Sequence, residues 1–92
     1  MNHKSGTFID NRGGIKINKL TINIDTVDKV KEFCNLCSKC VGEVSVYSGR
    51  YIVSGKSIMG LFSLDLCKAV EVEFYGDIPY EVKEGMKKFI VN

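Results

Sequence analysis

The chain has 92 residues, enough for one domain with a modest core, and 45% of them are hydrophobic. A net charge of +2, from 13 basic and 11 acidic residues, gives no strong attraction to nucleic acid or to a membrane surface. No apolar run approaches the length of a bilayer-spanning helix, and the N-terminus has no apolar stretch like the core of a secretion signal. We therefore expect a cytoplasmic protein whose 4 cysteines are thiols or ligands rather than disulfides.

The N-terminal segment is polar, contains a glycine pair and has no regular period, so we interpret residues 1–16 as an arm. The domain itself is predicted to span residues 17–92. Its first element is expected to be a strand, because apolar and polar residues alternate from Leu20 to Ile24.

A helix is expected next, with Asp25 and Thr26 offering an N-cap. Apolar residues then recur at steps of three and four, which is typical of one face of a helix of about four turns. This stripe consists of Val27, Val30, Phe33, Cys34, Cys37, Cys40 and Val41. Gly42 is expected to end the helix, since glycine commonly follows the last helical turn.

The second half of the chain predicts a hairpin, a short helix, a strand and a final helix. Two β-rich runs flank a Ser-Gly turn pair at 48–49, and Ser57 is a good N-cap for a short helix. Residues 69–76 alternate between apolar and acidic side chains, as in a half-buried strand. Asp77 is expected to cap the last helix, with Pro79 in its first turn. This order favours the α+β class, with helices packed on one face of an antiparallel sheet.

Three of the cysteines, Cys34, Cys37 and Cys40, are spaced as C-x-x-C-x-x-C, which is how iron–sulfur and zinc ligand sets often begin. The further cysteine and proline that complete a ferredoxin motif are missing from this window, and Cys67 lies far along the chain. The only histidine, His3, lies in the arm. Because the three cysteines continue a core-facing stripe, we interpret them as small hydrophobes and predict no metal ligand.

The segment KSIMGLFSL, residues 56–64, closely resembles the regulatory-serine segment of HPr, the phosphocarrier of the bacterial phosphotransferase system, in its Gram-positive form. The resemblance extends over residues 17–92, with matching order of elements. It implies an HPr-like open-faced β-sandwich, in which three helices cover one face of a four-stranded antiparallel sheet.

The resemblance places Thr26 where the family has its phosphorylated histidine, Asp28 where an arginine helps to hold the phosphate, and Lys29 where a proline stands. A threonine hydroxyl lacks the imidazole nitrogen that accepts and passes on a labile phosphoryl group. Asp28 would also repel a phosphate dianion. We therefore expect no catalytic residue, no phosphohistidine transfer and no enzyme.

The resemblance also implies a regulatory role for Ser57, because the matching serine of the family is phosphorylated by a dedicated kinase. The phosphorylated product docks on a transcriptional regulator of carbon catabolite control. A phosphate at this helix N-terminus would meet free backbone N–H groups, and Lys56 would add positive charge. Asp65 stands where the family usually has glycine and puts a negative charge near the helix end, which weakens this expectation.

A protein-docking patch is implied beside this serine. Ile58, Met59 and Phe62 match the positions that form the family's exposed apolar patch, whereas Leu61 and Leu64 are predicted to lie in the core. The expected partners are proteins, such as a kinase of the HPr type or a regulator protein.

Two functions remain open. The first is a regulatory binding protein of HPr type, and the second is a scaffold or a thiol- or metal-sensing module that uses Cys34, Cys37 and Cys40. A buried cysteine row with exposed Met59 and Phe62 would favour the first, and exposed thiols of low pKa would favour the second. We expect no cofactor. Scattered tyrosines and lysines with so small a net charge do not indicate nucleic-acid binding.

Overall fold

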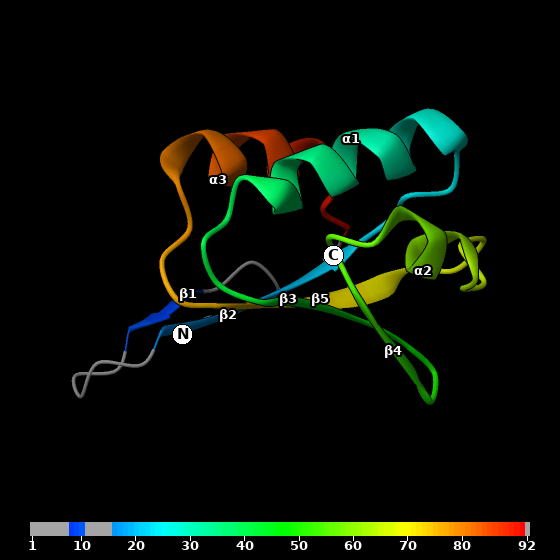
Figure 1. Cartoon of the computed structure of the whole chain (residues 1–92), viewed down its shortest axis with the longest axis horizontal. Coiled ribbons are helices and arrows are strands. Elements are labelled where there is room, and N and C mark those ends of the chain that lie inside the picture. The colour runs from blue at the N-terminus through cyan, green and yellow to red at the C-terminus, as the bar shows by residue number, and fades with distance from the viewer. Residues whose placement is uncertain (1–7, 11–15, 92) are drawn as a thin grey trace.

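The computed structural model of the protein describes residues 8–10 and 16–91 (Figure 1). In chain order its elements are β1 (Phe8–Asp10), β2 (Lys16–Ile22), α1 (Val27–Ser38), β3 (Val44–Ser48), β4 (Tyr51–Ser54), α2 (Ile58–Phe62), β5 (Val70–Tyr75), α3 (Tyr80–Met86) and the 3₁₀ turn η1 (Lys87–Phe89). The predicted α+β class, with an antiparallel sheet and three α-helices, is confirmed.

All five strands form one sheet in the order β1-β2-β5-β3-β4, and every neighbouring pair is antiparallel. The three helices lie together on one side of this sheet, and no described helix covers the other side, which we call the bare face (Figure 1). Strands β2 to β5 are the four that the sequence predicts. The additional strand β1 comes from the segment that we interpreted as an arm, and three residues are too short to give an alternation signal.

The core lies between the sheet and the helices. In β5 the side chains of Val70, Val72 and Phe74 are buried, whereas those of Glu71 and Tyr75 are exposed, so the predicted alternation is confirmed. Alternate side chains of a strand point to opposite faces of the sheet, and the three buried side chains of β5 point to the face that the helices cover. The hydrophobic effect on this one face therefore sets the register of the central strand.

Helix α1 begins where the sequence predicts, with Thr26 as N-cap, but it ends at Ser38 rather than at Gly42. The prediction of buried residues is wrong at both ends of the apolar stripe. Val27 is 55% exposed because it is the first residue of α1, one turn before the first buried residue, Val30. Val41 is 95% exposed because it lies beyond the end of the helix.

The start of α3 also differs from the prediction. Pro79, not Asp77, occupies the N-cap position, and no side chain caps this helix. Its missing backbone N–H makes proline compatible with a helix start, which explains why the helix begins without a polar cap. None of the helices in the described part of the chain is long and apolar enough to cross a membrane.

Candidate functional site

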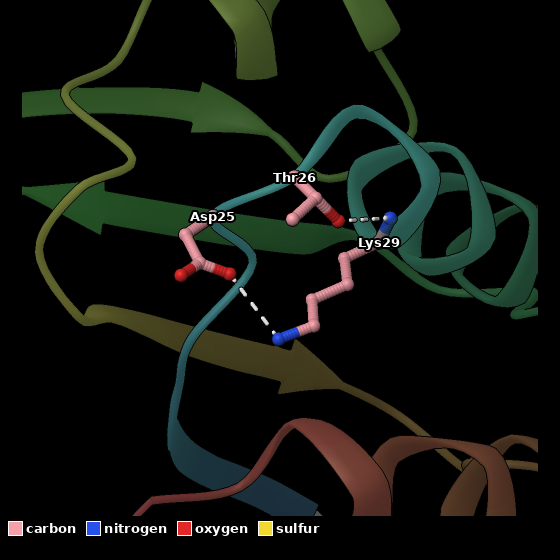
Figure 2. A network of polar contacts seen from close by, with 3 residues as sticks. All are labelled: Asp25, Thr26 and Lys29. Carbon is pink, nitrogen blue, oxygen red and sulfur yellow. Dashed lines mark hydrogen bonds and ion pairs between the residues drawn. The ribbon is translucent and has the colours of Figure 1, made fainter.

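The N-terminus of α1 is held by a small polar network (Figure 2). The Thr26 Oγ1 accepts a hydrogen bond from the Lys29 backbone N–H at 3.2 Å, and the Lys29 Nζ contacts the Asp25 carboxylate at 3.2 Å. Thr26 and Asp28 are exposed, so this helix end faces solvent. A hydroxyl that serves as a cap thus stands where the resemblance would place a histidine, with the carboxylates of Asp25 and Asp28 beside it.

The N-terminus of α2 is capped in the same way, as the sequence predicts. The Ser57 Oγ accepts a hydrogen bond from the Gly60 N–H at 3.1 Å, and Ser57 is exposed. A Cβ at Gly60 would lie 3.2 Å from both the Val53 Cβ and the Ser57 Oγ, so α2 packs closely on β4. The serine hydroxyl therefore sits on a fixed turn yet stays accessible to a protein that binds over it.

The ammonium group of Lys56 has a hydrogen-bond partner just beyond the end of α1. Its Nζ donates to the backbone carbonyl of Cys40 at 2.7 Å. A cation at this point stabilises the carbonyl end of α1, where the helix dipole is negative. The loop before α2 is thereby tied to the end of α1.

Two of the three predicted patch residues are exposed. Met59 is 77% exposed and Phe62 is 43% exposed, whereas Ile58 is half-buried and packs against the core. Leu61 and Leu64 are buried, as predicted. We call Met59 and Phe62 the α2 patch.

Two neighbouring residues of β4 are also exposed and were not predicted. Tyr51 lies on the helix-covered side of the sheet, whereas Ile52, which pairs with Tyr47, points to the opposite side. Tyr51 is 66% exposed and Ile52 is 62% exposed. β4 is the last strand of the sheet, so no neighbouring strand shields its side chains along one edge. The apolar run of residues 51–53 could not reveal this, because the position of a strand in the sheet is not encoded locally.

The cysteines lie mainly in the core. Cys37 is fully buried, Cys40 is 6% exposed and Cys34 is half-buried, while Cys67 is exposed. Burial raises the pKa of the Cys37 thiol far above its usual value and also raises the pKa of the Cys40 thiol. Among the described residues, no group of three or more histidine, cysteine or acidic side chains could hold a metal ion. A thiolate nucleophile or ligand is therefore disfavoured at Cys37 and Cys40.

The bare face of the sheet carries a polar network instead of an apolar patch. The Glu73 carboxylate accepts hydrogen bonds from the phenol groups of Tyr47, at 2.7 Å, and Tyr75, at 2.9 Å. The Tyr47 bond lowers the pKa of Glu73, and the carboxylate raises the pKa of Tyr47. A negative charge between these tyrosines would repel nucleic-acid phosphates.

No protein-family model, curated protein or solved structure matches this chain. The candidate function therefore depends on the geometry of the two capped helix ends and on the resemblance of residues 56–64 to HPr.

The buried position of Cys37 gives a direct prediction. Replacing Cys37 with serine is expected to lower the free energy of unfolding by about 1–3 kcal/mol, because a hydroxyl would be buried among apolar side chains. The matched change at exposed Cys67 is expected to stay within about 0.5 kcal/mol. Urea unfolding measures both. A neutral Cys37→Ser variant that lost bound zinc or iron would instead support the metal-sensing alternative.

Proposed function

We propose that this chain is an HPr-like, non-catalytic protein that binds other proteins and is regulated by phosphorylation of Ser57. The observation that carries the proposal is the α2 patch, which places exposed Met59 and Phe62 on the helix that the exposed Ser57 caps. Exposed apolar residues gathered at one place are a frequent mark of protein-docking surfaces. The order of β2 to α3 and the helices on one face of an antiparallel sheet support the HPr-like open-faced β-sandwich.

The end of α1 supports a role without phosphohistidine transfer. Thr26 keeps the capping function, since its Oγ1 accepts the Lys29 N–H, so the helix can form without a histidine. Its neighbouring acidic groups are Asp25, which pairs with Lys29, and Asp28. Two carboxylates with one ammonium leave a net negative charge at this helix end, which would oppose the approach of a phosphorylated partner.

The surroundings of Ser57 suit modification by a kinase. Its hydroxyl is exposed and stands on a turn whose conformation is held by the Gly60 N–H. A phosphoryl group there would add up to about two negative charges beside the apolar α2 patch. Modification would therefore change which proteins the patch can bind, and the expected partners are a kinase of HPr type and a regulator of carbon catabolite control.

The alternative of a thiol- or metal-sensing module receives less support. It would need accessible cysteines of low pKa, whereas Cys37 and Cys40 are buried with raised pKa values and only Cys34 of the row is half-buried.

The proposal predicts phosphorylation at Ser57. Incubation with ATP and an HPr kinase from a Gram-positive bacterium is expected to attach one phosphate, located by mass spectrometry of the digested protein. Ser57→Ala should accept none. Met59→Asp is expected to slow the reaction at least about tenfold, because it puts a charge into the apolar docking surface.

A matched control is Tyr80→Asp, which puts the same charge on α3 at a residue that is 75% exposed. This variant should be phosphorylated at the normal rate. Absence of phosphate on the unmodified chain would contradict the regulatory proposal. In a separate reaction with phosphoenolpyruvate and enzyme I, acid-labile phosphate on the chain would contradict the claim that it does not transfer phosphate.

A further inference from the structure

A polar groove adjoins the α2 patch. It lies between the β3–β4 turn and the segment that follows α2, and its volume is about 540 Å³. The side chains that line it come from both segments: Ser48, Arg50, Tyr51, Ser63, Asp65 and Lys68. Ser63, which lines the groove, is the residue directly after Phe62, so the groove reaches the end of α2.

The groove presents positive charge that has no ion-pair partner among the described residues. Among the side chains that the structure describes, neither Arg50 nor Lys68 has an ion-pair partner. Lysines elsewhere on the surface are engaged, as in the Lys39–Glu81 contact at 2.9 Å. The one acidic lining residue, Asp65, uses an oxygen to accept the Cys67 N–H at 3.3 Å. The two cations are thus available to carboxylates of another molecule.

Tyr51 adds apolar surface to the groove. Val53 pairs with the buried residue Val46, so Tyr51, two positions earlier on β4, lies on the same helix-covered face. Tyr51 is 66% exposed and lines the groove. The groove therefore offers apolar surface at Tyr51 beside a cationic part, and Ser63, the residue after α2, lines it as well.

We propose that this surface binds an acidic segment of a protein partner, with apolar side chains on the α2 patch and carboxylates at Arg50 and Lys68. The inference rests on the proposed protein-binding function and specifies the chemistry of the partner. Charge complementarity of this kind fixes the register of a bound segment and speeds its association. It also assigns a role to Asp65, which limits the net positive charge of the groove and disfavours polyanions such as nucleic acid.

The experiment is a titration of the nitrogen-15-labelled chain followed by amide chemical shifts. The probe is the peptide Glu-Glu-Leu-Phe-Glu-Glu, with Lys-Lys-Leu-Phe-Lys-Lys as its control. The acidic peptide is expected to shift the amides of α2 together with those of Arg50 and Lys68, and the basic peptide is not. The double variant Arg50→Ser, Lys68→Ser is expected to bind the acidic peptide about tenfold more weakly, since each exposed ion pair contributes up to about fivefold.

A matched double variant, Lys19→Ser with Lys87→Ser, removes the same charge from the bare sheet face and from η1. It should bind the acidic peptide as the unmodified chain does. Equal weakening by both double variants would overturn the proposal in favour of general charge attraction. Tighter binding of a single-stranded oligothymidylate to the same amides would overturn the assignment to an acidic protein segment.

The two proposals can fail separately. If Met59→Asp weakens peptide binding but the groove variant does not, the docking patch stands and the groove inference is wrong. If the groove variant weakens binding as expected while Ser57 accepts no phosphate from the kinase, the groove inference stands and the regulatory proposal is wrong.

Discussion

Replacement of Phe33 by alanine is expected to lower the free energy of unfolding by about 3–5 kcal/mol. Phe33 is fully buried on α1, and its ring meets that of Phe89 edge to face, with 6.3 Å between the ring centroids. Alanine would leave a cavity where α1, η1 and the sheet meet, and the edge-to-face contact would also be lost. Urea unfolding followed by circular dichroism measures the change.

The control for this prediction lies on the same helix. Val27 is 55% exposed, so Val27→Ala is expected to change the free energy of unfolding by less than about 0.5 kcal/mol. Similar losses in the two variants would mean that α1 does not pack on the sheet as described.

Gly42→Ala is expected to cost about 2–4 kcal/mol in the free energy of unfolding. A Cβ at Gly42 would lie 1.9 Å from the backbone carbonyl oxygen of Tyr75, a distance that no real contact reaches. Backbone atoms cannot rotate away as a side chain can, so the loop before β3 must move. The movement would strain the neighbouring hydrogen bond from the Tyr75 N–H to the Glu43 carbonyl, now 3.0 Å long.

Gly49→Ala is the control for this prediction, because it introduces backbone strain without a steric clash. Gly49 has a φ of +61°, yet a Cβ there would meet nothing within 4 Å. Its replacement should therefore cost only about 1 kcal/mol, the strain of a left-handed residue. A Gly42→Ala variant as stable as the unmodified chain, measured by thermal unfolding, would contradict the close approach of this loop to the end of β5.

The candidate site could be predicted from the sequence only where its interactions are local. Thr26 and Ser57 each cap the backbone N–H three residues later, and such a cap needs no distant partner. The exposure of Met59 and Phe62 agrees with the positions that the resemblance to HPr implies. The engagement of Lys56 with Cys40 could not be predicted, because it joins the loop before α2 to the end of another helix.

The sequence alone was sufficient for the order of β2 to α3, for the inward face of β5 and for the middle of the inward face of α1. Periodicity reports these features, since a side chain that alternates or recurs at helical spacing must find one buried face. The periodicity of α1 also predicted that Cys37 would lie on the core-facing side of the helix, which the structure confirms.

The tertiary structure alone decided which separate segments meet. It brought Arg50, in the β3–β4 turn, beside Lys68, in the segment after α2, and it set Gly42 against the carbonyl of Tyr75. The physical reason is that strand order and the approach of one loop to another follow from the packing of the whole sheet and its helices. No short stretch of residues carries that information, because its local pattern is satisfied by many arrangements of its neighbours.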